Sequence, residues 1–372
     1  LNPDIVYGGK VTRYDRRTRQ RQDVTPKPLR GENYRVLRTM PILFSPVDPH
    51  TLYFASNTLW QTTNGGKSWD VMSPDLTRES WDVPEVVGKY QGTPAAAVSR
   101  RGVIYTIAPS YVDKNTIWVG TDDGLIHVTR DGGTTWTNVT PPDLVSWAKV
   151  SLMDASHTDS DTAYAAINTL RLDDLRPHIY RTRDGGHTWA HITNGIPDGG
   201  PVNVVREDPQ RPGLLFAGTE RTVYVSFNDG DQWQSLRLNL PATSIRDLIV
   251  KNDDLVVGTH GRGFWILDDI TPLRQLSADI VNSSLHLFAP QNAWRFRWNK
   301  YTDTPPPPEE PAGENPPDGA LIHYFLGPNS SGPVILEILN SDGSIVRRYS
   351  SEDAPEASLE GLNVPDYWPR PH

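Results

Sequence analysis

One eight-residue pattern occurs four times in this chain of 372 residues, and it constrains the fold more than any other feature. The pattern is Ser/Thr-x-Asp/Asn-x-Gly-x-x-Trp. Its third residue can accept hydrogen bonds from the N–H groups of a turn, and its glycine supplies a positive φ. The tryptophan offers a large ring for packing. We therefore expect four β-hairpin corners built on Asn64, Gly66 and Trp69; Asp131, Gly133 and Trp136; Asp184, Gly186 and Trp189; and Asn228, Gly230 and Trp233.

A second recurring element is a short β-rich run that ends in a small residue. Its six copies are Ile5–Gly9, Thr51–Ser56, Thr116–Thr121, Thr162–Ile167, Leu214–Thr219 and Leu255–Thr259. The shortest interval between pattern tryptophans is 44 residues, near the period of a four-stranded propeller blade. In one repeat the expected strands are about Val103–Ala108, Thr116–Gly120, Leu125–Thr129 and Thr134–Val139. These patterns predict an all-β chain with about six propeller repeats in residues 1–300.

The four corners match the Asp-box, also called the BNR repeat. With Arg171–Thr182 and Val256–Asp269, they make the chain resemble bacterial sortilin-like β-propeller proteins that are commonly labelled glycosyl hydrolases. That family is distantly related to sortilin and to xyloglucanase-type glycoside hydrolases. The resemblance implies an exported protein: extracellular, periplasmic or on the bacterial cell surface.

The two ends of the chain indicate an internal piece of a longer protein. The sequence begins Leu1-Asn-Pro and stops at His372, inside what reads as an unfinished module. We expect preceding chain to complete the propeller ring, and the blades to pack against the rest of the same protein. Residues 301–319 are rich in proline and predict a stiff polyproline II linker. Residues 320–372, with a turn at Ser341–Gly343, predict part of an immunoglobulin-like β-sandwich.

Composition excludes several classes of partner and site. Acidic side chains outnumber basic ones, 45 to 36, which argues against nucleic acid or an anionic membrane as the main partner. There is no cysteine for a disulfide or a thiolate zinc site, and no apolar run long enough to span a membrane. The sequence shows no metal-ligand motif and no phosphate or dinucleotide fingerprint, so we expect no metal and no cofactor.

The candidate functional residues lie in the loops that join the second and third strands of each blade. These loops share one face, whereas the four corners join the third and fourth strands on the opposite face, so Asp131 and Asp184 are expected to be turn caps. The loops supply Asp122, Asp123, Asp173 and Asp174 as candidate catalytic carboxylates, and Arg171, Arg176, Glu220, Arg221, His260 and Arg262 as candidate binding residues.

Two functions remain open at this point. Inverting glycoside hydrolases need two carboxylates about 6.5–9.5 Å apart, which converging loops could provide. The acidic pairs could equally cap their loops in water, and Arg262 could bind an anion or pair with Asp268 or Asp269. The pairs do not match the xyloglucanase catalytic positions, and the sialidase-type arginine triad is missing. We therefore expect a non-catalytic propeller that holds a protein, peptide or glycan, with a polysaccharide hydrolase as the alternative.

Overall fold

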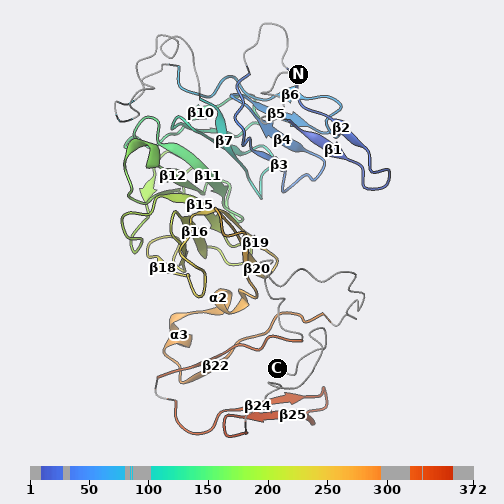
Figure 1. Ribbon diagram of the computed structural model, residues 1–372, viewed down its shortest axis with the longest axis vertical. Coiled ribbons are helices and arrows are strands. Elements are labelled where there is room, and N and C mark those ends of the chain that lie inside the picture. Colours follow the sequence, from blue (N-terminus) through green and yellow to red (C-terminus); the bar gives the residue numbers. More distant parts are fainter. Residues whose placement is uncertain are drawn as a thin grey trace. The chain divides into compact units, whose positions relative to one another are not determined.

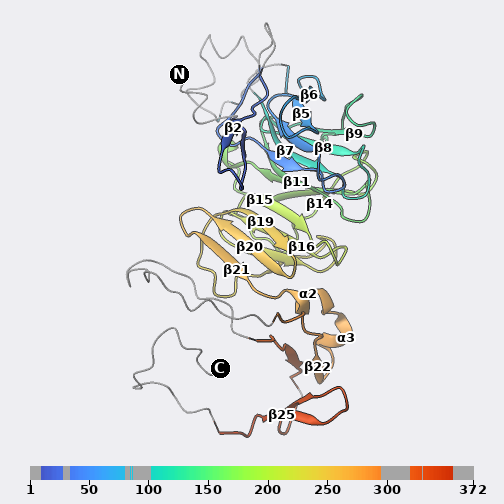
Figure 2. The same ribbon diagram turned by 90° about the vertical axis from the view of Figure 1, so that its right-hand side faces the viewer.

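The computed structural model describes residues 10–27, 34–79, 84, 86, 102–294, 319–328 and 330–354. The chain divides into two compact units, Leu1–Ile266 and Leu267–His372 (Figures 1 and 2). The division places residues 267–300 in the second unit, whereas the sequence assigns them to the propeller. The run at Ile5–Gly9 and the proline-rich segment at 301–318 lie outside the described residues.

The first unit is a series of antiparallel sheets, each built from consecutive strands, and the prediction of a β-propeller is confirmed. Among the described residues, four of these sheets have four strands and one has three, besides a two-stranded N-terminal sheet that is described below. The strands are β3 (Ile42–Phe44), β4 (Leu52–Ala55), β5 (Leu59–Thr62) and β6 (Asp70–Val71); β7 (Ile104–Pro109), β8 (Ile117–Thr121), β9 (Ile126–Thr129) and β10 (Thr137–Asn138); β11 (Lys149–Ala155), β12 (Ala163–Asn168), β13 (His178–Thr182) and β14 (Ala190–His191); β15 (Val202–Glu207), β16 (Leu215–Thr219), β17 (Val223–Ser226) and β18 (Gln234–Ser235); and β19 (Ile245–Lys251), β20 (Asp254–Thr259) and β21 (Phe264–Leu267).

In the four sheets that begin with β7, β11, β15 and β19, the first strand is the innermost. These four strands contact one another from sheet to sheet. The sheets therefore follow one another as the blades of a propeller do, with their outer strands pointing away from the shared inner side.

Each of the four sequence patterns forms the corner between the third and fourth strands of a blade, and we call these corners the box turns. In the box turn at Thr129–Trp136, the Gly133 amide donates to Thr129 Oγ1 (2.8 Å) and the Thr135 amide donates to Asp131 Oδ1 (2.8 Å). The same two bonds occur in the other three turns, at 2.9–3.0 Å. The fifth-position glycines have φ between 82° and 95°. The fourth position also has a positive φ in every box turn, and Asp229 occupies it where the others have glycine.

The box tryptophans are equivalent but not equally buried. Trp233 is 2% exposed, whereas Trp69, Trp136 and Trp189 are only partly buried. Each indole Nε1 donates to a main-chain oxygen just after the outer strand of the preceding blade. In the first blade the acceptor is Val24, at 2.7 Å.

The hydrogen bond to Val24 shows which blade position the N-terminal hairpin occupies. This hairpin consists of β1 (Thr12–Tyr14) and β2 (Arg21–Asp23). Val24 occupies the position of Met72, Val139 and Ile192 in the later blades. The hairpin therefore corresponds to the third and fourth strands of a preceding blade. Its turn, at 15–20, lacks the box pattern.

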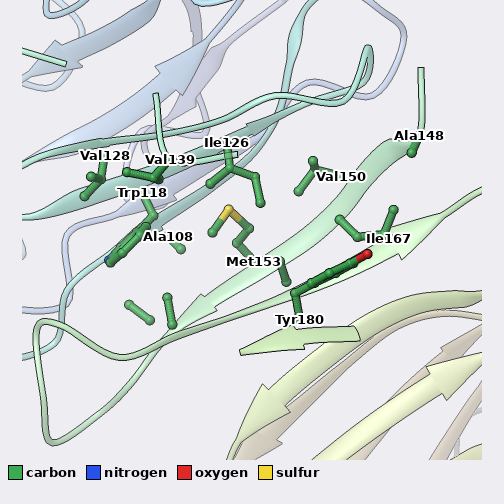
Figure 3. Packing of buried hydrophobic residues seen from close by; sticks show 13 residues of the cluster. Ala108, Trp118, Ile126, Val128, Val139, Ala148, Val150, Met153, Ile167 and Tyr180 are labelled. Atoms are coloured by element: carbon green, nitrogen blue, oxygen red, sulfur yellow. The ribbon is translucent and has the colours of Figure 1, made fainter. Parts of the chain in front are cut away.

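Apolar side chains fill the space between neighbouring blades. Figure 3 shows Met153 of β11 pointing toward Ile126 of β9, in the cluster between the second and third blades. Close packing explains the glycine near the end of two of the β-rich runs. A Cβ added to Gly120 would lie 2.3 Å from Val150 Cγ1, and one added to Gly218 would lie 2.5 Å from Ile245 Cγ2.

The fifth blade lacks a fourth strand among the described residues. Phe264 of β21 is 82% exposed, whereas its equivalents Leu59, Ile126, Ile179 and Val223 are 0–2% exposed. In the other blades this position packs against the inner strand of the next blade, as Leu59, Ile126 and Ile179 do, and among the described residues no further blade follows β21.

The second unit begins with two short helices, α2 (Thr271–Gln275) and α3 (Ala278–Val281). Strand β22 (Leu285–Leu287) pairs with β23 (Tyr324–Leu326), and β24 (Ile335–Leu339) pairs with β25 (Ile345–Ser350) across a turn at 340–344. The predicted hairpin at Ser341–Gly343 is therefore present. Two separate two-stranded sheets do not confirm an immunoglobulin-like sandwich. No helix in the described part of the chain is long and apolar enough to cross a membrane.

Candidate functional site

A β-bulge recurs at the same place in four inner strands. The register shifts by one residue at Tyr105 in β7, Ser151 in β11, Asn203 in β15 and Arg246 in β19. Each bulge lies at the start of its strand, opposite the end of the second strand. It is therefore on the face of the loops between the second and third strands, which we call the loop face. Bulges re-aim side chains and often border functional sites, so the start of the inner strands is where we look for chemistry.

The acidic pair of the second blade has two different environments. Asp123 is 1% exposed and is a structural cap, because its Oδ1 accepts from Thr121 Oγ1 (2.5 Å) and its Oδ2 from the Arg78 amide (2.9 Å). Asp122 is partly buried and accepts from the Val103 amide at 2.8 Å. Burial raises the pKa of Asp122, and the Asp123 charge adds to the rise against the opposing bond from Val103.

Arg171 connects the third blade to Asp122. Its Nη2 donates to the main-chain oxygen of Asp122, its Nη1 lies 4.0 Å from Asp122 Oδ2, and its Nε donates to the Trp147 main-chain oxygen at 2.8 Å. The guanidinium also lies over the Trp147 ring, 5.3 Å from the ring centroid. Trp147 has a φ of 68°, an unusual conformation for a bulky residue that marks local strain.

Glu220 lies in a hydrogen-bonded chain that crosses three blades. Asn168 donates to Asn203 Oδ1 at 2.6 Å, and Asn203 donates to Glu220 Oε1 at 3.0 Å. Arg246 Nη1 lies 3.1 Å from the same oxygen. Two of these residues, Asn203 and Arg246, are bulge residues.

Lys149 completes this group, which we call the loop-end cluster: Tyr105, Asp122, Lys149, Arg171, Asn203, Glu220 and Arg246. The Lys149 ammonium lies over the Tyr105 ring, 4.6 Å from its centroid. Burial lowers the pKa of Lys149, and the charges of Arg171 and Arg246 lower it further, against the opposing effects of Asp122 and Glu220. The Lys149 ammonium is therefore close enough to interact with the other four charges of the cluster.

Asp173 and Asp174 form the acidic pair of the third blade. In the described residues, no contact joins them to the loop-end cluster. Asp174 is held by Arg176, whose Nε and Nη2 both lie 2.9 Å from its two oxygens, and by His178 at 3.0 Å. The Arg176 bonds hold the pKa of Asp174 well below its usual range. Asp173 is exposed in a left-handed turn at the end of a short 3₁₀ helix, Leu170–Leu172.

Arg221, His260 and Arg262 are exposed on the same face. In the described part of the chain, the guanidiniums of Arg221 and Arg262 form no ion pair. The recorded bonds of Arg262 involve its main-chain N and O, with Thr259 Oγ1 and Trp265 Nε1. The expected structural bridge from Arg262 to Asp268 or Asp269 is not among them.

The opposite face carries structural carboxylates. Thr188 donates twice to Asp184 and lowers the pKa of this carboxyl to about 2, and Thr135 lowers that of Asp131 in the same way. At the far end of β11, buried Asp154 pairs with Arg206 (3.3 Å) and accepts from the Glu207 amide (2.9 Å). These groups are saturated by protein partners, which suits a role in stability.

Sequence reasoning named the loop residues of the cluster, Asp122, Arg171 and Glu220, but not its strand residues. Tyr105, Asn203 and Arg246 each follow the first buried aliphatic residue of an inner strand, and Lys149 precedes one. This shared position can be seen in the sequence, but it indicates a common site only when the bulge at the start of the inner strands is known.

No family model matches this chain. The chain is 24% identical over 261 residues to a probable oligoxyloglucan-reducing end-specific xyloglucanase of Neosartorya fischeri, which covers 62% of this chain and 31% of the relative. It is 24% identical over 187 residues to an oligoxyloglucan-reducing end-specific xyloglucanase of Emericella nidulans, covering 49% and 20%. The chain thus spans less than a third of the length of these curated relatives.

Among solved structures, the GH74 xyloglucanase of Xanthomonas campestris is similar with a TM-score of 0.47 and 17% identity, over 75% of this chain and 45% of that one. The two sequence relatives support a glycosyl hydrolase-like protein. They do not bear on the sortilin-like resemblance.

Proposed function

We propose that this chain belongs to a secreted glycoside hydrolase that acts on a polysaccharide, and that the loop-end cluster is its reaction site. The proposal replaces the non-catalytic interpretation as our first choice. Sequence similarity to two xyloglucanases supports it. The observation that carries it is the environment of Asp122, a partly buried carboxyl at the loop face with a raised pKa.

A raised pKa is what a glycosidase requires of its general acid, which must hold a proton until the glycosidic oxygen takes it. In this proposal Asp122 donates that proton to the leaving oxygen. Glu220 is the second carboxylate: it removes a proton from the water that attacks the anomeric carbon. The base is negatively charged in this step, and Glu220 lies against the Arg246 guanidinium at 3.1 Å.

The test is hydrolysis of a polysaccharide panel that includes xyloglucan, with reducing ends measured for the full natural protein. We expect Asp122→Asn and Glu220→Gln each to lower the rate by about 10²–10⁴-fold, the usual contribution of general acid–base catalysis. Asp184→Asn is the matched control, because Asp184 is a turn cap on the opposite face. Release of sugar that survives both loop-face substitutions would contradict the proposal.

A second candidate is a propeller that binds a glycan, peptide or protein without cleaving it. The observation in its favour is that Asp123 and Asp174 are saturated by local bonds, while Arg221 and Arg262 extend into solvent. Charge reversal at Arg221 or Arg262 should then weaken binding and leave the melting temperature nearly unchanged, because surface charges contribute only about 0–1 kcal/mol. Absence of sugar release from every polysaccharide in the panel would favour this candidate.

A further inference from the structure

The loop-end cluster holds more positive than negative charge. Lys149, Arg171 and Arg246 supply three cations, and Asp122 and Glu220 supply two carboxylates. Arg246 is paired with Glu220, and Arg171 lies beside Asp122. In the described residues, no carboxylate lies within 4.0 Å of the Lys149 ammonium, which contacts the Tyr105 ring instead.

The environment of Lys149 is an unfavourable one for a cation. The side chain is half-buried and loses part of its hydration, and two guanidiniums repel it. Tyr105 offers its ring face, which stabilises an ammonium only modestly. An anionic group placed beside Lys149 would offset the repulsion from the two guanidiniums, which Asp122 and Glu220 oppose only in part.

The two carboxylates of the cluster do not supply that anion. Asp122 accepts from the Val103 amide, and Glu220 is held by Asn203 and Arg246. The whole chain has a net charge of −9, so its overall field repels polyanions. Affinity for an anion must therefore come from a local site, and the loop-end cluster has the charge for one.

We propose that Lys149, with Arg171 and Arg246 beside it, binds the carboxylate of a uronic acid residue, and that the polysaccharide recognised by this chain is acidic. Assigning the anion to a sugar rests on the proposed function. The three cations come from β11, the loop after β12, and β19. The bound sugar therefore lies across the third and fifth blades, next to Asp122 and Glu220.

The experiment is a calorimetric titration of the full natural protein with trigalacturonate and with the carboxyl-reduced, neutral trisaccharide of the same linkage. We expect trigalacturonate to bind at least tenfold more tightly than the neutral sugar, and the difference to shrink as salt is added. Lys149→Met keeps the aliphatic stem and removes the charge. It should weaken trigalacturonate binding by about tenfold or more and leave neutral-sugar binding unchanged, since a charge-assisted hydrogen bond is lost.

Two further variants keep the result interpretable. Lys149→Arg should restore most of the affinity, which distinguishes a lost charge from a damaged fold. Lys251→Met removes the same charge from the other end of β19 and should have no effect. Equal binding of both trisaccharides, no binding of trigalacturonate, or equal losses in Lys149→Met and Lys251→Met would each overturn the proposal.

The outcome is separable from that of the proposed function. Hydrolysis of neutral xyloglucan that depends on Asp122, without binding of trigalacturonate, would refute the uronate site and keep the hydrolase. Trigalacturonate binding that depends on Lys149, without cleavage of any polysaccharide, would keep the uronate site and refute the hydrolase.

Discussion

The indole Nε1 of Trp233 donates a 2.8 Å hydrogen bond to the main-chain oxygen of Ile192, which follows the outer strand of the preceding blade. A Cβ on Gly230, in the same box turn, would lie 2.3 Å from Ile192 Cδ1, so the turn closes tightly on this residue. The equivalent bond recurs at Trp69, Trp136 and Trp189. Each box turn is therefore a connection between blades, and the blades should unfold as coupled neighbours.

Replacing Trp233 by alanine should be the most damaging change among the box tryptophans. Trp233 is 2% exposed, so its removal leaves a cavity and should cost about 3–5 kcal/mol of unfolding free energy. Trp136 is only half-buried, and Trp136→Ala should cost less. Urea denaturation measures both. Trp233→Phe keeps most of the ring and loses the bond to Ile192, with an expected cost of about 1 kcal/mol. Equal losses in Trp233→Ala and Trp136→Ala would contradict the order derived from burial.

Gly120→Ala should destabilise the contact between the second and third blades. The added methyl would meet Val150 Cγ1 at 2.3 Å in a close-packed interior, an overpacking that costs about 1–3 kcal/mol. Gly258 holds the equivalent position in β20, where a Cβ would find its nearest neighbour at 3.6 Å. Gly258→Ala is therefore the matched control and should be nearly neutral in the same denaturation experiment. A loss at Gly258 as large as that at Gly120 would show that the backbone, rather than packing, requires glycine.

The sequence predicted the strands well wherever turn chemistry and the hydrophobic pattern agreed. In the second blade the inner strand was expected at Val103–Ala108 and is found at Ile104–Pro109. The outer strand was expected at Thr134–Val139 but extends only over Thr137–Asn138. The reason is that the Thr135 amide donates to Asp131 Oδ1 and is not available for strand pairing.

The candidate site was less predictable than the fold. The loops could be read from the repeat, but which carboxylate stays chemically available depends on partners that are distant in the sequence. Asp123 is capped through Arg78, 45 residues away, whereas its neighbour Asp122 is not. The contribution of Lys149 and Arg246 depends on inner-strand bulges, and strand periodicity alone does not locate a one-residue register shift.

The last prediction concerns His127 of β9, a buried histidine that makes stability depend on pH. Burial lowers its pKa to about 4. Asp75, Arg78 and Glu79 line the same recess. The pKa of His127 in the folded chain lies below its value of about 6.5 in the unfolded chain. As the pH falls from 6.5 to 4, the unfolded chain therefore binds a proton at this residue and the folded chain does not. The stability that the neutral, buried His127 contributes is thus fully present above pH 6.5 and is lost progressively down to pH 4. By pH 5 the unfolding free energy should have fallen by about 2 kcal/mol for this reason.

His127→Phe keeps a ring and removes the titrating group, so the unfolding free energy of the variant should fall less steeply than that of the wild type between pH 7.5 and pH 5. Urea denaturation across that range gives both slopes, and their difference cancels the contribution of the carboxylates that the two proteins share. His187→Phe, at an exposed box-turn position, is the control for the exchange of a histidine for a phenylalanine. If the His127→Phe and wild-type curves run parallel, His127 takes up its proton equally in the folded and unfolded chains, and the buried, neutral state assigned to it is wrong.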